Sequence, residues 1–302
     1  MLRCCDAGDV VAVEYAKFAR RRIVPPAMPD RPADLSTASA AGHRPVRSYV
    51  LREGRLTAGQ RRALEALWPK YGLDLAVDAG RAGGGLCDGG DGGFDGDFDS
   101  GFAAGFDTGA DPNAAPDYPQ IFGRSAPLHL EIGFGDGEAL LEMAARNPHC
   151  DFLGAEVHRP GVGRALLQIE ARQVANIRLF RADGFQVLSA AVAPRALAAL
   201  YLYFPDPWPK KRHHKRRLLQ PRFIALAASR LATGGHFHFA TDWQDYAEQA
   251  LARLEEFNGW ENCAGRGRFS PRPPARPQTK FERRGQRLGH PVWDIVMRKT
   301  AE

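Results

Sequence analysis

Two hydrophobic periods alternate along the chain between residues 128 and 297. Short apolar runs bounded by Gly, Asp or Pro are typical of buried strands, and the segments between them repeat apolar residues at the spacing of an amphipathic helix. The pattern predicts strands at 128–132, 152–157, 177–181, 200–204, 236–240 and 292–297, and helices at 138–146, 161–175, within 187–200, at 221–231 and at 245–257. This alternation predicts an α/β fold whose mostly parallel sheet carries helices on both faces.

The regions outside this main domain have other compositions. Residues 1–45 are rich in Ala, Arg and Pro without a sustained period, so we expect a disordered basic tail. Residues 78–117 contain twelve Gly and nine Asp, and such a segment cannot bury a core. We therefore expect a disordered Gly/Asp-rich insert there, followed by the main domain at 118–302.

A short basic segment, 46–77, lies between the tail and the insert. Thr57 and Gln60 have the spacing of a capping box, which predicts the start of a helix. Its apolar side chains recur on one face, and Pro69 and Gly72 are expected to end it.

Charge is unevenly distributed over the 302 residues. The formal net charge is +6 and the pI is about 9.2. Residues 265–299 alone carry ten Lys or Arg against two acids, and this local excess favours an anionic partner.

Cysteine usage and hydropathy bear on whether the protein has disulfides, a metal site or a membrane span. The five cysteines form no CxxC pair and have no metal-binding spacing, so we expect free thiols in a reducing cytoplasm and no metal site. No apolar stretch approaches the ~18 residues of a membrane span. We therefore expect no membrane association, and the sequence is compatible with a monomer or a homodimer.

Acidic side chains follow the carboxyl ends of five predicted strands, at Glu131, Glu156, Asp183, Asp206 and Asp242. Because ligands of open α/β sheets bind beyond these ends, the five carboxylates predict one binding pocket. For Glu131 and Asp183 a helix cap or a buried salt bridge is the structural alternative.

The turn after the first main-domain strand, 133–137, resembles a dinucleotide-binding loop but departs from it. The position of the third glycine is occupied by Glu138, and Asp136 adds negative charge where a pyrophosphate would lie. Glu156 follows Gly133 at the distance of an acid that binds ribose hydroxyls. A nucleoside cofactor without phosphate fits this pattern, which indicates S-adenosylmethionine, with Asp183 placed to receive an adenine amino group.

One stretch, 204–217, joins a carboxylate to a block of cations. Three prolines follow Phe204, Asp206 and Trp208, and we expect them to hold these residues extended. Trp208 is a candidate for stacking on a base, although a packed surface indole fits equally well. The cations and histidines after it are candidates for phosphate contacts: Arg212, His213, His214, Lys215, Arg216 and Arg217.

Five motifs together resemble the bacterial tRNA (guanine-N7-)-methyltransferases. They are LEIGFG at 130–135, GAEVH at 154–158, FPDPWPK at 204–210, ATDW at 240–243 and RPQTKFERRG at 276–285. The resemblance covers 46–70 and 121–299. It implies a Rossmann-like class I methyltransferase fold with a seven-stranded sheet. It also implies methyl transfer from S-adenosylmethionine to N7 of a guanosine at position 46 of tRNA, in the variable loop.

The resemblance also implies roles for single residues. Asp206 is the implied catalytic residue. The implied cofactor contacts are Glu131, Gly133, Gly135, Glu156, Asp183 and Asp206. The implied substrate contacts are Lys210, Asp242, Thr279, Lys280, Phe281 and Glu282.

Two other functions remain open on the residues alone. An exocyclic amino methyltransferase acting on DNA or RNA has an Asp-Pro-Pro motif, whereas here Trp208 follows Asp206-Pro207. A non-catalytic RNA-binding protein with a methyltransferase fold is the other alternative, and the complete set of strand-end acids argues against it.

Overall fold

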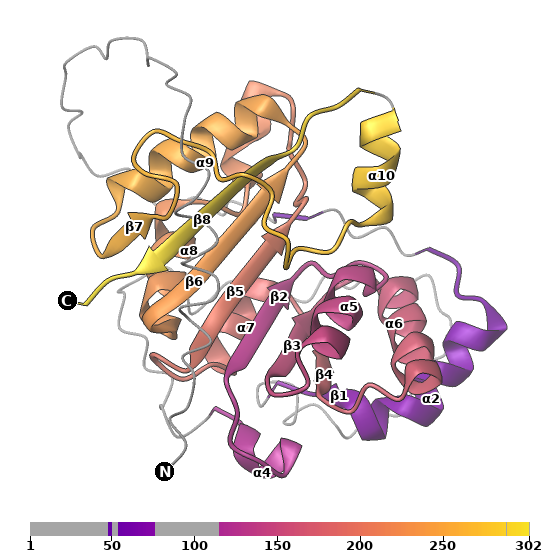
Figure 1. Ribbon diagram of the computed structural model, residues 1–302. Helices are drawn as coiled ribbons and strands as arrows, with labels where there is room; N and C mark the ends of the chain where they lie inside the picture. Colours follow the sequence, from indigo (N-terminus) through magenta and orange to yellow (C-terminus); the bar gives the residue numbers. More distant parts are fainter. Residues whose placement is uncertain (1–47, 50–53, 76–114, 288, 302) are drawn as a thin grey trace, which may run out of the picture.

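The computed structural model describes residues 48–49, 54–75, 115–287 and 289–301 (Figure 1). The predicted tail, 1–45, lies outside these ranges, as does the predicted insert apart from 115–117. The described part folds around one twisted sheet that carries helices on both faces.

The sheet has eight strands in the order β1-β4-β3-β2-β5-β6-β8-β7. Their bounds are β1 (Gly72–Leu73), β2 (Leu128–Ile132), β3 (Asp151–Ala155), β4 (Ile177–Phe180), β5 (Leu197–Tyr203), β6 (Leu231–Thr241), β7 (Trp260–Asn262) and β8 (Trp293–Lys299). All neighbours are parallel except β8, which runs antiparallel to β6 and β7. The strand order reverses between β2 and β5, and this is the point where open α/β sheets bind ligands.

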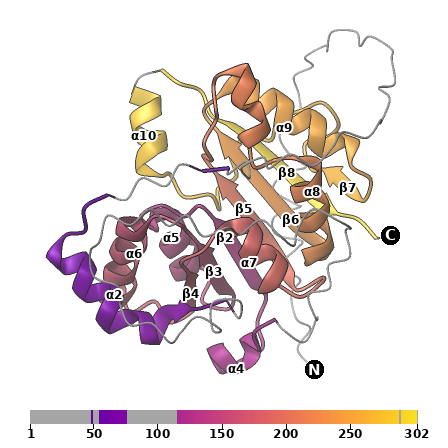
Figure 2. The same ribbon diagram turned by 180° about the vertical axis from the view of Figure 1, so that it is seen from behind.

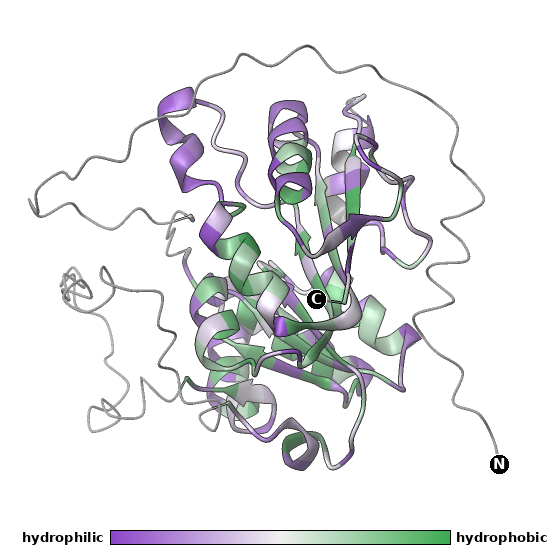
Figure 3. Ribbon diagram, turned by 90° about the vertical axis from the view of Figure 1, so that its left-hand side faces the viewer, coloured by the Kyte–Doolittle hydropathy of each residue, from purple (hydrophilic) through white to green (hydrophobic). Residues whose placement is uncertain are grey.

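Helices cover both faces of the sheet and bury two apolar clusters (Figures 1 and 2). Their bounds are α2 (Ala58–Tyr71), α4 (Tyr118–Phe122), α5 (Glu138–Arg146), α6 (Arg159–Arg172), α7 (Gly184–Ala190), η2 (Lys211–Arg216), α8 (Pro221–Arg230), α9 (Gln244–Glu256) and α10 (Lys280–Arg287). Side chains of α2, α5 and α6 form the cluster on one face, and those of α7, α8 and α9 contribute to the cluster on the other. Figure 3 shows hydrophobic residues concentrated on the central strands and on the helices beside them.

The prediction of an α/β fold with a mostly parallel sheet is confirmed, with one strand more than the seven expected. Two of the eight strands, β1 and β7, lie outside the ranges that the hydrophobic pattern predicted, and β1 pairs in parallel with β4 at the edge. It follows α2 directly, so the basic N-terminal segment extends the main sheet. Two residues are too few to give a period-2 signal, which explains why the sequence did not predict this strand.

Of the two residues expected to end α2, only Gly72 does so, because the helix continues through Pro69 to Tyr71. Tertiary contacts hold this last turn. Tyr71 Oη and Lys70 Nζ lie 2.5 and 2.8 Å from Glu170 Oε2 of α6. At the helix end, the Trp68 indole covers Gly72, where a Cβ would be 2.2 Å from the ring, so Gly72 is the C-cap as expected. The predicted capping box between Thr57 and Gln60 is confirmed.

Several other boundaries agree with the hydrophobic pattern, and β2 and α5 have the predicted bounds. The strand β6 starts earlier than predicted, at Leu231, and passes through a register irregularity at two glycines. Gly234 has φ of 81°, and a Cβ at Gly235 would lie 3.0 Å from the Leu197 carbonyl oxygen. These glycines interrupt the pairing locally rather than preceding the strand. The sequence did not predict η2, β7 or α10.

Candidate active site

The five strand-end acids lie along one edge of the sheet. Glu131 is in β2, Glu156 follows β3, Asp183 precedes α7, and Asp206 and Asp242 follow β5 and β6. Since β2 to β6 are parallel neighbours, their carboxyl ends meet at this edge. The structure therefore brings the five residues to the same side of the molecule, as the sequence predicted.

The glycine turn after β2 depends on left-handed backbone conformations. Gly133, Gly135 and Gly137 have φ of 75°, 60° and 84°. The start of α6 lies directly against this turn, since a Cβ at Gly161 would be 2.3 Å from the Gly135 carbonyl oxygen. Side chains at these positions would be strained or would push the turn away from α6.

Glu156 ties this turn to the end of β3. One carboxylate oxygen, Oε2, accepts a hydrogen bond from Gly135 N at 2.8 Å. The other, Oε1, accepts from Val157 N at 2.8 Å and from His158 N at 2.9 Å. Three backbone donors orient the carboxylate at the position expected for a ribose contact.

Asp136, the unusual acid of the turn, faces α6. Its carboxylate lies 3.6 Å from Arg164 Nε, and its carbonyl oxygen accepts a hydrogen bond from Gln168 Nε2 at 2.9 Å. The negative charge is therefore partly balanced outside the turn, on the side of α6.

Glu131 is the most deeply buried of the five acids, at 3 % exposure. Its Oε2 has no hydrogen-bond partner among the described residues. Burial, together with the charge of Glu156, raises the pKa of Glu131 to about 8. A buried carboxylate oxygen without a partner fits a site that receives a cationic or hydrogen-bond-donating ligand.

Asp183 caps α7. Its Oδ1 accepts hydrogen bonds from Phe185 N at 2.9 Å and Gln186 N at 3.2 Å. The structural alternative considered for this residue is therefore present, and it fixes the orientation of the carboxylate at the end of β4.

The Pro-rich loop after β5 does not have the expected backbone. Phe204 and Trp208 have φ of 49° and 46°, so the prediction that both are extended was wrong. Non-glycine residues in this region cost on the order of 1–3 kcal/mol and persist where surrounding contacts hold them. Phe204 N donates a 2.8 Å hydrogen bond to the Ala240 carbonyl oxygen. These contacts leave Asp206 exposed at the tip of the loop.

Trp208 is packed rather than presented for stacking. Its indole N–H donates to the Ser48 carbonyl oxygen at 3.0 Å, which connects the N-terminal segment to this loop. Arg216 lies 4.8 Å above the ring, and His213 meets it edge-on with ring centroids 5.9 Å apart. Of the two interpretations of this tryptophan, the structure shows the packed indole.

The cations after the loop fall into two groups. Lys210, Lys211, Arg212 and Lys215 are exposed on and before η2. Burial and the neighbouring arginines and lysines lower the pKa of His213. His214 lies 3.6 Å from the Asp245 carboxylate.

Arg217 belongs to the second group, because its side chain is buried. It donates to the Pro207 carbonyl oxygen at 2.8 Å and to Asp245 at 2.5 Å. Arg217 was expected to contact RNA; in this structure its guanidinium links the Pro-rich loop to α9.

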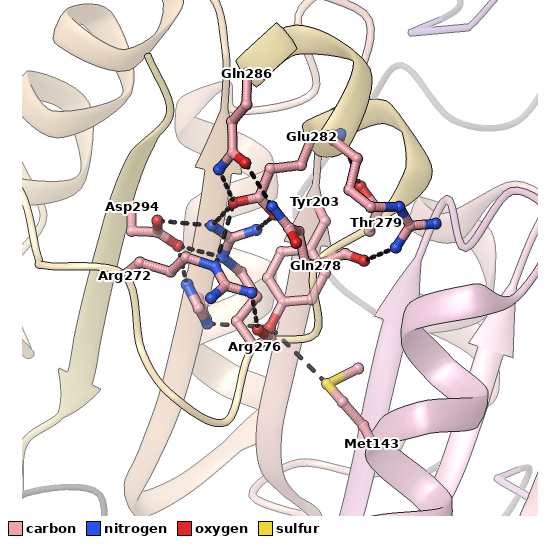
Figure 4. A network of polar contacts seen from close by, with 11 residues as sticks. Met143, Tyr203, Arg272, Arg276, Gln278, Thr279, Glu282, Gln286 and Asp294 are labelled. Carbon is pink, nitrogen blue, oxygen red and sulfur yellow. Dashed lines mark hydrogen bonds and ion pairs between the residues drawn. The ribbon is translucent and has the colours of Figure 1, made fainter. Parts of the chain in front are cut away.

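The segment around α10 contains a buried ionic cluster (Figure 4). Arg276 Nη1 and Nη2 lie 2.7 and 2.9 Å from the two Glu282 carboxylate oxygens, and Arg276 Nε lies 2.7 Å from Asp294 Oδ1. Burial acts to lower the pKa of Arg276, but the hydrogen bonds and charges of Glu282 and Asp294 outweigh it and raise that pKa. Glu282 was expected to contact substrate; in this structure the residue is 1 % exposed and its carboxylate is engaged by Arg276.

The remaining residues expected to contact substrate lie nearby. Thr279 Oγ1 accepts a hydrogen bond from Glu282 N at 3.2 Å, at the start of α10. A Cβ at Gly285 would lie 3.9 Å from Asp242 Oδ2, so α10 and the end of β6 are adjacent. Lys280 and Phe281 belong to α10, and their side chains lie outside the described part.

Sequence reasoning missed Arg276, Asp294 and Arg283. Arg283 Nη2 lies 2.5 Å from Glu138 Oε1, which links α10 to the first turn of α5. The available signal was an acid next to the apolar run of the last strand, since Asp294 directly precedes Ile295 and is buried at 2 % exposure.

Comparison with known proteins identifies the class. A family model described as "Putative methyltransferase" matches residues 125–295. The crystal structure of the 16S rRNA methyltransferase KamB shares 15 % identity over 62 % of this chain and 95 % of its own, with a TM-score of 0.47. With its sheet order and its strand-end acids, the protein is a methyltransferase of the Rossmann-like class I fold.

Curated relatives narrow this class to one family. The tRNA (guanine-N(7)-)-methyltransferase of Alkalilimnicola ehrlichii is 48 % identical over 270 residues, which cover 89 % of this chain and 98 % of the relative. That of Methylococcus capsulatus is 49 % identical over 257 residues, covering 85 % and 95 %. The chain belongs to the tRNA (guanine-N(7)-)-methyltransferase family.

Proposed function

We propose that this enzyme transfers the methyl group of S-adenosylmethionine to N7 of a guanosine in the variable loop of tRNA, at position 46. The observation that carries the proposal is the pair Glu131 and Glu156 beside the left-handed glycine turn. One acid is buried with an unpartnered oxygen, and the other is oriented by three backbone donors.

The residues at this edge fit a cofactor that has a ribose and positive charge but no phosphate. Glu156 would hold ribose hydroxyls, and Asp183 would receive the adenine amino group. Glu131, with Gly133 and Gly135, would line the methionine part. Clustered carboxylates repel phosphates but favour a cationic sulfonium and ammonium. When bound, the cofactor supplies an electrophilic methyl group.

The chemistry of guanine N7 determines what the protein must contribute to methyl transfer. Guanine N7 has a free lone pair, so no base is needed to deprotonate it. The N7–methyl bond forms as the sulfur–methyl bond breaks, and the positive charge passes from sulfur to the purine. The protein's main contribution is the in-line placement of the base.

Asp206 is the residue that we assign to the catalytic role. Its carboxylate is exposed at the tip of a strained loop, where it can accept hydrogen bonds from the guanine N1–H and amino group. The same charge stabilises the developing cationic purine. Lys210, Asp242 and Thr279 flank this loop and are the proposed substrate contacts, with Lys280 and Phe281 of α10.

The exposed cations of η2 are the proposed contacts to the RNA backbone. Lys211, Arg212 and Lys215 are exposed and have no ion-pair partner within the described residues. We propose a cytoplasmic enzyme, where its tRNA substrate is found. Within the described part, no helix is long and apolar enough to cross a membrane, and no group of His, Cys, Asp and Glu could hold a metal.

Chemical cleavage tests both the product and the position. Transfer RNA is treated with the purified protein and S-adenosylmethionine, then with borohydride and aniline, which cleave at N7-methylguanosine. Cleavage at position 46 is expected. Methyl incorporation without cleavage would instead indicate the exocyclic amino methyltransferase alternative, and no incorporation would favour a non-catalytic RNA-binding protein.

A further inference from the structure

We propose that Arg276 is a positioning residue, which holds the Asp206 loop and the α10 segment in one fixed geometry. The two parts are more than sixty residues apart in the sequence and carry different proposed contacts. This inference rests on the proposed function, because it concerns how that site is assembled.

On the α10 side, Arg276 forms a bidentate pair with the Glu282 carboxylate through Nη1 and Nη2. The two nitrogen–oxygen distances are 2.7 and 2.9 Å, and both residues are 1 % exposed. Asp294 of β8 lies 2.7 Å from Arg276 Nε and 3.1 Å from Nη2. A forked pair of this kind fixes direction as well as distance, which a lysine cannot do.

On the other side, the same guanidinium reaches the start of the Asp206 loop. Arg276 Cζ lies 5.7 Å from the centroid of the Phe204 ring. Phe204 is one of the two strained residues of the loop and stands two positions before Asp206. Arg276 therefore contacts the residue whose backbone sets where the catalytic carboxylate points.

A chain of hydrogen bonds also connects the ionic cluster of Arg276, Glu282 and Asp294 to β5. Asp294 Oδ1 lies 2.7 Å from His238 Nε2, and His238 Nδ1 lies 3.0 Å from the Tyr203 hydroxyl. All three residues are buried, and Tyr203 directly precedes Phe204. The cluster thus connects the sheet end that bears Asp206 with the helix that bears the substrate segment.

Other contacts of α10 are less able to set its position. Arg283 pairs with Glu138 of α5 at 2.5 Å, but their side chains are 46 % and 32 % exposed. Exposed pairs contribute ~0–1 kcal/mol and are screened by salt. Arg272 Nε also lies 3.2 Å from Glu282 Oε1, but the Arg272 side chain is 41 % exposed. The fully buried fork at Arg276 is therefore the contact that most resists rotation of α10 against the loop.

The alternative is that Arg276 only stabilises the fold, and the chain offers a matched control for that case. Arg230 is also buried, at 6 % exposure, and donates to the Leu188 and Ser189 carbonyl oxygens, each at 3.1 Å. It lies at the end of α8, beside the amino ends of the strands. Arg276→Lys and Arg230→Lys make the same change inside and outside the site.

The test combines hydrogen exchange with single-turnover kinetics on the full-length folded proteins. Amides of 203–210 and of 279–287 are expected to exchange faster in Arg276→Lys and to be unchanged in Arg230→Lys. At saturating tRNA and S-adenosylmethionine, the methylation rate of Arg276→Lys should fall by about 100-fold, as expected for misplaced reacting groups. Arg230→Lys should stay within about threefold of wild type, because its site geometry is intact.

Glu282→Gln provides a second variant that preserves shape, and on its own it should speed exchange at 203–210 and at 279–287 even if Arg276→Lys does not fold. Where both variants fold, the double variant should lose less rate than the two single losses combined, because both changes break the Arg276–Glu282 contact. Faster exchange at 279–287 alone would overturn the proposal, as would equal rates for the two lysine variants. Wild-type turnover reports on the proposed function separately, and the exchange result stands without it.

Discussion

At the residue scale, the acids at the carboxyl ends of the parallel strands differ in their hydrogen-bond partners within the protein. Glu156 has three backbone donors, and Asp183 caps a helix. Glu131 is buried with an unpartnered oxygen, so its protonation is the one that a bound cation would change most. The sequence predicted where these acids stand along the strands, but it could not predict their partners, because those come from other elements.

The raised pKa of Glu131 predicts pH-dependent cofactor binding. Its pKa is about 8 in the folded protein, against an ordinary value of 4.5. Between these values the folded protein without cofactor holds an extra proton, which a cationic ligand would displace. Affinity for S-adenosylmethionine should therefore rise with pH up to about 8 and then level off. Calorimetry in two buffers of different ionisation enthalpy should detect the released proton.

The same residue predicts a trend in stability. A folded pKa above the unfolded value means that stability declines as the pH rises from about 4.5 to about 8. Glu131→Gln removes the buried ionisable group, so its unfolding free energy should decline less over this window, with a gain at pH 8.5 on the order of a few kcal/mol. Parallel pH curves for both proteins in urea unfolding would contradict the assignment.

Asp206→Asn tests the catalytic carboxylate while keeping its size. Loss of the charge that stabilises the cationic purine should lower the single-turnover rate by about 100-fold or more, with tRNA binding retained. Glu261→Gln is the control, because it neutralises an exposed acid that pairs with Arg298 on β8. A normal rate in Asp206→Asn together with weakened tRNA binding would contradict the assigned role.

At the element scale, local sequence signals were reliable where the element stabilises itself and failed where tertiary contacts decide. The capping box of α2, the bounds of α5 and the turn glycines follow from short-range chemistry. Pro69 was misjudged because hydrogen bonds to Glu170 of α6 and the Trp68 ring hold the last turn of α2. The left-handed Phe204 was misjudged for the same reason, since its neighbours override the preference set by Pro205.

The capping box of α2 yields a prediction at this scale. Thr57→Ala removes the side-chain acceptor for Gln60 N and should cost about 1 kcal/mol of stability. Thr233→Ala, at an exposed position in β6, should change stability by no more than about 0.5 kcal/mol. Chemical unfolding of the two variants measures the difference, and equal losses would show that the cap does not stabilise α2.

At the scale of the whole molecule, the basic run 210–217 contains both exposed cations and a buried structural arginine, and the sequence did not distinguish them. Arg212 and Lys215 are exposed, whereas Arg217 is buried against Asp245 and the Pro207 carbonyl oxygen. A charge run reveals its net charge but not which side chain turns inward, because that depends on α9, which packs beside it. The same limit applied to Glu282, whose partner Arg276 lies in the same motif.

Because some cations of this run are exposed and Arg217 is buried, substitutions at neighbouring positions should affect different properties, either tRNA binding or stability. Arg212→Gln with Lys215→Gln should weaken tRNA binding and reduce its salt slope by about one for each phosphate that is no longer neutralised. Arg217→Gln should instead lower the unfolding free energy by about 2 kcal/mol, because it removes the hydrogen bonds of a buried guanidinium to the Pro207 carbonyl oxygen and to Asp245. Filter binding over a salt series and chemical unfolding provide the two measurements. A reduced salt slope in a stable Arg217→Gln protein would reverse the assignment.

The central claim is that the carboxyl edge of this sheet transfers a methyl group to guanine N7. The most direct measurement is nucleoside analysis of tRNA after incubation with the purified enzyme and S-adenosylmethionine. N7-methylguanosine should appear as the new methylated nucleoside, and Asp206→Asn at the same concentration should form it about 100-fold or more slowly. A different product, such as N2-methylguanosine or N6-methyladenosine, would contradict the account.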